Sequence, residues 1–196
     1  ASTNSYNCYT QMAELSNGNL AFTYRTADDN YMLRIFQPNG TPVTGEISVQ
    51  KTGTGNGTCS TQSASSATIA ANHTGTFMIT HHCDSNTNLY GTLYNNDGTQ
   101  VTVGAVQHFV VGTHTGSPGA YVMGLTDNNF MVAYNNGSGY VLSKVTPTGT
   151  VTTSGSVSST SGYPVFNALG DGGFAAFDYR IATDGTTDTY YDTGAR

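Results

Sequence analysis

The fold is decided by four short stretches in which large and small side chains alternate: Leu20-Ala21-Phe22-Thr23-Tyr24, Phe77-Met78-Ile79-Thr80-His81, Phe130-Met131-Val132-Ala133-Tyr134 and Phe174-Ala175-Ala176-Phe177-Asp178. A polar turn rich in Asn, Asp, Thr and Gly precedes each stretch. A period of two is typical of a half-buried β-strand, so we expect the large side chains to face a core and the small ones to face away from it. The stretches begin at residues 20, 77, 130 and 174, at intervals of 57, 53 and 44 residues.

A second landmark lies downstream of each stretch, where an aromatic residue or Val stands four residues before a glycine. The four pairs are Phe36 and Gly40, Tyr94 and Gly98, Val145 and Gly149, and Tyr190 and Gly194. The glycines are 58, 51 and 45 residues apart, so the two landmarks shift together and indicate one unit copied four times. Asn39-Gly40 and Asp97-Gly98 predict tight hairpins whose two central residues both adopt positive φ.

Each unit predicts a four-stranded antiparallel meander. The first strand of copy one covers Gln11 to Leu15, and fourth strands are expected at Pro42 to Val49, Val101 to Val106 and Val151 to Val157. Four-stranded units of about 40–50 residues are typical of propeller blades. We therefore expect one all-β domain over 1–196 with a four-bladed β-propeller-like fold, and a β-sandwich or barrel as the alternative. The repeats span approximately 11–52, 67–109, 119–158 and 163–196.

The fourth copy has no counterpart of the fourth strand, which predicts an unpaired sheet edge. The segment 1–10 has the right length to fill this edge as an assembly strand, with Ser2, Asn4, Tyr6 and Cys8. It could close the fold within one chain, or insert into a neighbouring molecule and link the subunits into a filament. A third explanation is that the chain is cut from a longer repeat array.

The composition excludes several classes of function. Only 9% of the residues are charged, against about 25% in an ordinary soluble domain, and the net charge is −6. Six basic residues predict no interaction with nucleic acid, and no apolar run is long enough to predict a membrane span. Ser, Thr, Asn and Gly together make up nearly half of the chain, which favours an extracellular protein. The start at Ala1-Ser2-Thr3, without Met, indicates a mature secreted or cell-surface product.

The first copy resembles a tandem repeat of large bacterial surface and secreted proteins, over Leu15 to Tyr24 and Phe36 to Val49. That family's pattern is Leu-x-Asp-Gly-Gly-Phe-Val-Val-x-Trp, a spacer, and Asp-x-x-Gly-x-x-x-Gly-x-Glu-Phe-x-Val. The fourth copy carries the opening half as Leu169-Gly-Asp-Gly-Gly-Phe-Ala-Ala-Phe177, and copies two and three match in outline. The tryptophan is replaced by Tyr24, His81, Tyr134 and Asp178. The resemblance implies an adhesive and structural role at the cell surface, and it brings no catalytic residues.

Three cysteines, an odd number, predict one disulfide and one thiol that is free or bridges to another chain. Cys59 and Cys83 are the expected pair because both flank the same predicted hairpin; three reduced thiols are the alternative. Candidate N-glycosylation sites occur at Asn39, Asn56, Asn72 and Asn136, about as many as chance provides.

No catalytic signature is present, so we expect neither an enzyme nor a cofactor. A calcium site is a minor alternative, because five aspartates crowd the end of the chain without the usual ligand spacing. They are Asp171, Asp178, Asp184, Asp188 and Asp192. His81-His82-Cys83 has the chemistry of a zinc site. Adjacent residues of a strand point to opposite faces, however, so we expect a structural histidine at the edge of the core and no metal.

Two functions remain. The first is a non-enzymatic extracellular structural or adhesive protein that assembles with itself into a surface filament through its N-terminal strand. The second is a monomeric, lectin-like propeller that binds surface glycans with tyrosines such as Tyr121, Tyr134, Tyr140 and Tyr163. A hydrolase would need two placed carboxylates, and the two glutamates, Glu14 and Glu46, give that reading little support.

Overall fold

The fold comes from a computed structural model, which describes residues 10–26, 31–49, 67–82, 87–104, 108–115, 120–157, 165–169, 173–180 and 189–195. For 176–180 and 189–195 it describes the backbone alone. Every regular element in these ranges is a β-strand, which confirms the predicted all-β class. The described ranges accordingly contain no helix that could cross a membrane.

The strands form four antiparallel sheets, which we call blades 1 to 4. Blade 1 contains β1 (Gln11–Glu14), β2 (Leu20–Arg25), β3 (Tyr31–Phe36) and β4 (Ile47–Ser48). Blade 2 contains β5 (Thr68–Ala71), β6 (Thr76–His82), β7 (Asn88–Asn95), β8 (Gln100–Val101) and β9 (Phe109–Thr113). Blade 3 contains β10 (Tyr121–Gly124), β11 (Phe130–Asn135), β12 (Tyr140–Val145) and β13 (Val151–Val157). Blade 4 contains β14 (Val165–Ala168), β15 (Phe174–Arg180) and β16 (Thr189–Ala195).

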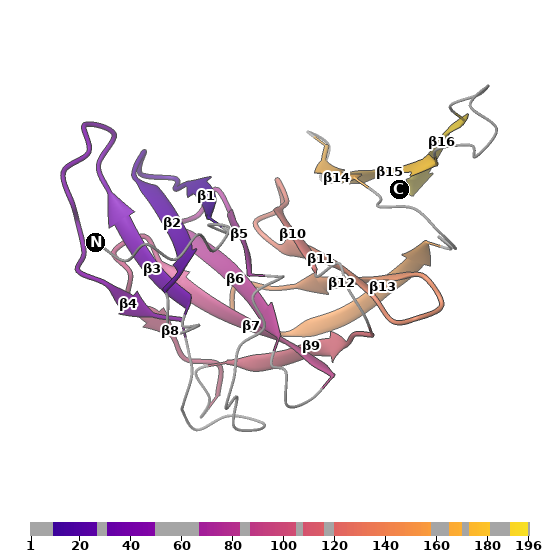
Figure 1. Cartoon of the computed structure of the whole chain (residues 1–196), viewed down its shortest axis with the longest axis horizontal. Coiled ribbons are helices and arrows are strands. Elements are labelled where there is room, and N and C mark those ends of the chain that lie inside the picture. Colours follow the sequence, from indigo (N-terminus) through magenta and orange to yellow (C-terminus); the bar gives the residue numbers. More distant parts are fainter. Residues whose placement is uncertain are drawn as a thin grey trace.

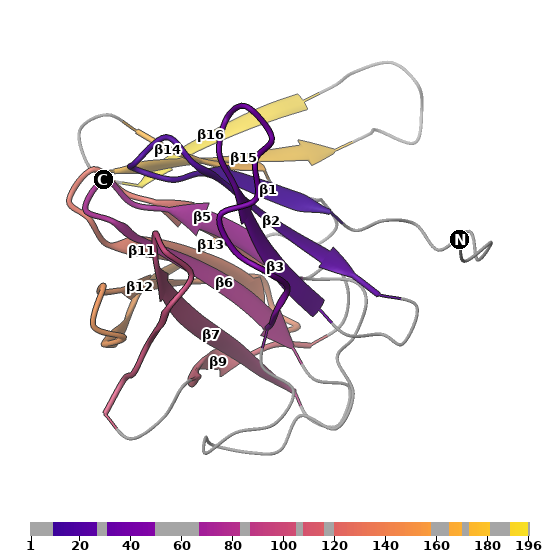
Figure 2. The ribbon, with the colours of Figure 1, turned by 90° about the vertical axis from the view of Figure 1, so that its left-hand side faces the viewer.

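The blades follow one another along an arc (Figure 1). The first strand of each blade lies on the inner side of the arc, and these strands contact one another in the order β1, β5, β10 and β14. Blades 1 and 4 therefore occupy its two ends. Figure 2 shows the arc from the side of blade 1, whose β1, β2 and β3 lie nearest the viewer.

The three larger hydrophobic cores each lie between two successive blades rather than within one. The first joins blades 1 and 2 through residues such as Leu33, Ile35, Phe77 and Ile79. The second joins blades 2 and 3, and the third joins blades 3 and 4. Every blade inside the arc thus has a front face against the preceding blade and a back face against the next.

The hairpin turns differ from the prediction in one respect. Gly40 and Gly98 both have φ of 85°, but Asn39 and Asp97 do not have positive φ. In the first hairpin the Gly40 N–H donates to the Gln37 carbonyl at 2.9 Å, and the Gln37 N–H donates to the Thr41 carbonyl at 2.8 Å. This is a three-residue loop in which one glycine takes the left-handed conformation, so the prediction of two such residues is wrong.

The register of blade 4 corrects the fourth pair of landmarks. Leu20 pairs with Phe36, Phe77 with Tyr94 and Phe130 with Val145. The equivalent residue, Phe174, pairs with Ala195, whereas Tyr190 pairs with Tyr179. Tyr190 and Gly194 therefore do not correspond to Phe36 and Gly40. A spacing of four residues was satisfied by chance in this copy.

The fourth strand of blade 2 is divided. β8 pairs with β7 over two residues, and β9 pairs with the other half of β7. Of the strand predicted over Val101 to Val106, only Val101 belongs to β8 among the described residues, and the blade extends to Thr113 rather than to residue 109. The predicted fourth strand of blade 3 is confirmed as β13.

Candidate functional site

The most unusual surface is the front face of blade 1. By the strand register it carries Met12, Leu20, Phe22, Tyr24, Met32, Arg34 and Phe36. Leu20, Phe22 and Tyr24 are only half-buried, whereas Ala21 and Thr23 on the other face are fully buried. The expectation that the large side chains of this strand face the core is therefore wrong for blade 1.

The equivalent side chains of the next two blades are buried. Phe77 and Ile79 lie in the core between blades 1 and 2, and Phe130 and Val132 lie in the core between blades 2 and 3. The pattern of large residues is thus the pattern of a front face that meets a preceding blade. In the described part of the chain, no blade covers the front face of blade 1.

Aromatic and polar contacts hold this front face in place. The Phe22 and Phe36 rings meet edge to face at 5.6 Å, and the Arg34 guanidinium lies 5.0 Å from the centre of the Phe36 ring. The Tyr24 hydroxyl donates to Glu46 Oε1 at 2.6 Å. Burial, and then the nearby Glu46 carboxylate, raise the pKa of Tyr24 to about 12. Glu46 thus has a structural contact.

The far end of the arc has a matching apolar surface. Leu169 follows β14 and is 40% exposed, and Val165 within β14 is 53% exposed. The equivalent residues Leu15 and Leu125 are 2% and 1% exposed, because each packs in a core shared with the next blade. Blade 4 also has an unpaired edge: among the described residues β16 pairs with β15 alone.

Several predicted residues lie outside the described residues. They are the assembly-strand residues Ser2, Asn4, Tyr6 and Cys8, the predicted disulfide residues Cys59 and Cys83, the glycosylation candidate Asn56, the aspartates Asp171, Asp184 and Asp188, and Tyr163. Asp178 and Asp192 are described by their backbone alone. The disulfide, the strand and the calcium site stay predictions.

The three described glycosylation candidates have different surroundings. Asn39 and Asn136 lie in exposed turns. Asn72 is 3% exposed, and its Nδ2 donates to Thr76 Oγ1 at 2.7 Å and to the Asn128 carbonyl at 2.9 Å. A glycan would replace one of the two Nδ2 hydrogens that make these bonds, and the buried side chain leaves it no room. Asn72 therefore has a structural role in this fold. It takes the place that Leu15 and Leu125 hold in their blades.

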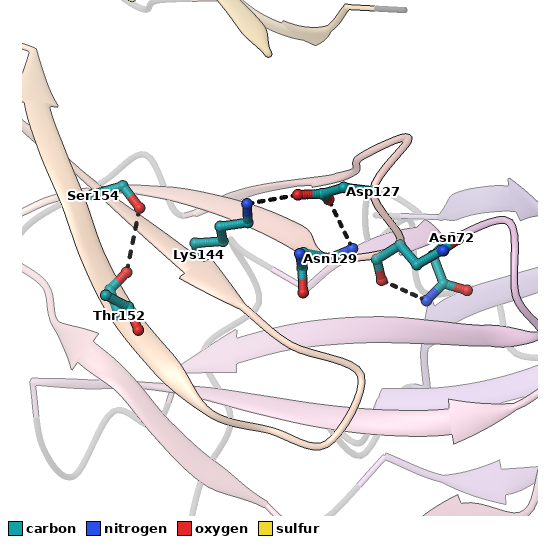
Figure 3. Close-up of polar contacts among 7 residues, drawn as sticks. Asn72, Asp127, Asn129, Lys144, Thr152 and Ser154 are labelled. Carbon is teal, nitrogen blue, oxygen red and sulfur yellow. Dashed lines mark hydrogen bonds and ion pairs between the residues drawn. The ribbon is translucent and has the colours of Figure 1, made fainter. Parts of the chain in front are cut away.

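The contact from Asn72 joins the first turn of blade 2 to that of blade 3 (Figure 3). In the same turn, Asp127 accepts from Lys144 Nζ at 2.6 Å and from the Asn129 N–H at 3.1 Å. Burial alone would raise the pKa of Asp127, but these hydrogen bonds outweigh it and leave that pKa below its ordinary value. Asn72 thus links blades 2 and 3, and the Asp127 contacts hold the turn of blade 3 that it binds.

A second candidate site is a group of four histidines in blade 2. His81 and His82 end β6, while His108 and His114 flank β9. The His81 ring stacks on Tyr90 at 5.8 Å, and the His108 ring lies 6.4 Å from His81 and 5.2 Å from Tyr90. His82 contacts His114 instead, with ring centres 4.4 Å apart. His81 and His82 thus have separate aromatic partners, as expected for adjacent residues on opposite faces of a strand.

His81 is 1% exposed, and neither of its ring nitrogens has a hydrogen-bond partner in the described structure. Burial, followed by repulsion from His108 and His82, lowers the pKa of His81 to about 3, so the side chain is neutral at pH 7. No group of three or more metal-ligating side chains occurs within the described ranges. The sequence analysis missed His108 and His114, because only correct placement of β9 would have put them beside β6.

A small cavity lies at the β11–β12 hairpin. It has a volume of about 220 Å³ and is lined by Asn136, Ser138, Gly139, Tyr140, Val141, Ser156 and Val157. Of the tyrosines proposed to bind glycans, Tyr134 and Tyr140 are buried and Tyr121 is half-buried. Tyr121 and Tyr140 pack with Phe166 in one aromatic group. Core packing accounts for most of their ring surface.

Comparison with known proteins identifies the fold but no family. No protein-family profile matches the sequence, and no curated protein is similar to it. A solved structure of a protein from Lactobacillus plantarum, of β-propeller type, matches with a TM-score of 0.51 and 13% sequence identity. The match covers 94% of this chain and 54% of that chain, so this chain spans about half the length of that protein. The likeness supports the propeller-like arrangement of blades and concerns the fold alone.

Proposed function

We propose that this is a non-enzymatic structural or adhesive protein of the cell surface, which binds further copies of itself through an N-terminal strand added to blade 4. The observation that carries the proposal is the edge of β16. In the described structure β3, β7 and β12 have a partner strand on each side, whereas β16 pairs with β15 alone. An open edge offers a row of backbone N–H and C=O groups to a strand from another molecule.

The surface chemistry supports a role in assembly rather than in electrostatic recognition. The chain has only six Lys and Arg residues against twelve Asp and Glu residues. Association therefore has to rest on backbone pairing and apolar contact. The resemblance of the first repeat to those of bacterial surface proteins favours the same role.

The test is the mass of the protein in solution, with and without residues 1–10. We expect light scattering coupled to size exclusion to show multiples of 20.5 kDa for the full chain and a monomer for the truncated chain. Replacing Asn4 and Tyr6 by Pro should have the same effect as truncation, because proline cannot donate to a ladder. Cys8→Ser is the control, since it removes the thiol and keeps the strand. Assembly that persists without residues 1–10 would refute the strand mechanism.

Carbohydrate binding is the second candidate, and the cavity beside Tyr140 is the observation that favours it. Its volume of about 220 Å³ is below the roughly 300–1,000 Å³ of small-molecule sites, so it would hold at most a single sugar unit. A glycan array tests this function. A hit that is lost in Ser156→Phe and kept in Thr152→Phe would support it, and the absence of any hit would refute it.

A further inference from the structure

We infer that the front face of blade 1 is a docking surface for the back face of blade 4 of a second copy of this chain. The contact would repeat, between molecules, the packing that joins successive blades within one molecule. The inference rests on the proposed function in so far as both require self-association. It concerns a different surface, because strand addition uses the edge of β16 and this contact uses sheet faces.

The chemistry of the front face indicates a blade as its partner. At the other front faces, the equivalents of Leu20 and Phe22 are Phe77 and Ile79 in blade 2, and Phe130 and Val132 in blade 3. All four of those side chains are fully buried against the preceding blade. The same strand in blade 1 therefore has the residues of a blade contact, and no blade covers it in the described part of the chain.

Exposed large apolar side chains lie at both ends of the arc. Within the described ranges they are Met12, Val43, Val165 and Leu169, at 56%, 41%, 53% and 40% exposure. The first two belong to blade 1 and the last two to blade 4. No comparably exposed residue of this kind occurs in the described parts of blades 2 and 3. The two ends are thus complementary in chemistry and in their place in the repeat.

The geometry favours a second copy as the partner. The contacts between inner strands run from β1 through β5 and β10 to β14, which places the two apolar faces at opposite ends of the arc (Figure 1). The match covers 54% of a propeller-type chain, so two copies of this chain together have about the length of one such chain. The contact is head to tail, and it closes into a ring if the rotation completes a turn or continues as a filament if it does not.

The experiment uses two variants that each disable one end. Phe22→Arg places a positive charge on the front face, and Leu169→Arg places one on the back face, so the two altered faces repel each other. Both contacts act in one assembly, so loss of either face should leave each variant alone as a monomer. Their mixture should form a complex of two chains, because the intact back face of the first variant meets the intact front face of the second. Gln37→Glu, in an exposed hairpin turn, is the control and should assemble as the unaltered chain does.

The outcomes separate this inference from the proposed function. Loss of assembly in both face variants, with recovery on mixing, supports the docking contact. Assembly that survives both variants but is lost without residues 1–10 overturns the docking contact and keeps the strand mechanism. Assembly that survives removal of residues 1–10 but is lost in the face variants overturns the strand mechanism and keeps the docking contact. If the unaltered chain is a monomer, both are overturned. If circular dichroism shows that Phe22→Arg is unfolded, Met12→Arg replaces it, because Met12 is 56% exposed.

Discussion

Protonation of His81 should make the free energy of unfolding fall steeply in mild acid. The folded pKa of His81 is about 3, and the ordinary value is 6.5. Because the folded pKa lies below the unfolded one, the unfolded chain binds the proton first. Neutral His81 makes its full contribution to the free energy of unfolding above pH 6.5. This contribution is lost progressively as the pH falls from 6.5 towards 3.

The magnitude follows from the two pKa values. At pH 5 the unfolded state gains about 2 kcal/mol from protonation of this one side chain, relative to pH 7, while folded His81 stays neutral. His81→Phe should remove this loss and keep the ring that packs on Tyr90. The substitution also removes two buried nitrogens without hydrogen-bond partners, so stability at pH 7 should not fall.

The assay is urea unfolding of the native chain and of His81→Phe at a series of pH values from 7.5 to 4.5. The difference between the two proteins isolates His81, because His82 and His108 are present in both. His73→Gln is the control, since His73 lies exposed in the turn between β5 and β6. The reasoning is refuted if His81→Phe loses as much stability between pH 7 and pH 5 as the native chain.

Three further substitutions test two contacts between blades 2 and 3 and one ion pair within blade 3. In Gly124→Ala the new Cβ would lie 1.9 Å from the Ala71 carbonyl oxygen, so thermal unfolding should show a loss of about 1–3 kcal/mol, whereas Gly155→Ala, with open space around it, should change stability by less than about 1 kcal/mol. Asn72→Ala should cost about 2 kcal/mol and lower the melting temperature by about 4–8 °C, because it removes buried hydrogen bonds within blade 2 and to blade 3. Lys144→Met should change the free energy of unfolding in urea by less than about 1 kcal/mol, since its ion pair with Asp127 is partly exposed. Salt screens such a pair, so a change above about 1 kcal/mol in 0.5 M salt would contradict this expectation.

Much of the fold could be predicted because each copy of the repeat has two sequence signals. One is the strand of alternating large and small residues, and the other is the glycine of the following hairpin. Three copies obeyed both landmarks, and their strands pair in the expected order. The fourth copy satisfied the second landmark by coincidence, since Ala195 rather than Tyr190 pairs with Phe174. Only pairing across the sheet could reveal this, because a glycine four residues after an aromatic residue is not specific to a hairpin.

The candidate sites were harder to predict because they depend on segments far apart in the sequence. His108 reaches His81 only because β9 pairs with the first half of β7, after β8 has paired with the second half. The role of Asn72 depends on the carbonyl of Asn128, in the next blade. The Asn-x-Ser/Thr sequence motif is the same whether the asparagine is exposed and can be glycosylated or is buried and hydrogen-bonded. For Asn72, only the position of Asn128 in the next blade shows which of the two it is.

The front face of blade 1 also could not be predicted, because its exposure depends on a contact with another blade. The alternation of Leu20, Phe22 and Tyr24 correctly predicts a strand with one apolar face, but periodicity does not say what covers that face. In a blade repeat the cover is the preceding blade, so the first copy presents apolar side chains that have no preceding blade in the described structure. Exposed apolar area of this kind favours association, because each Å² that is buried stabilises the complex by about 25 cal/mol. β2 matches the equivalent strands of the other blades in sequence pattern, but its large side chains are less buried. It is therefore the strand at which self-association should be sought.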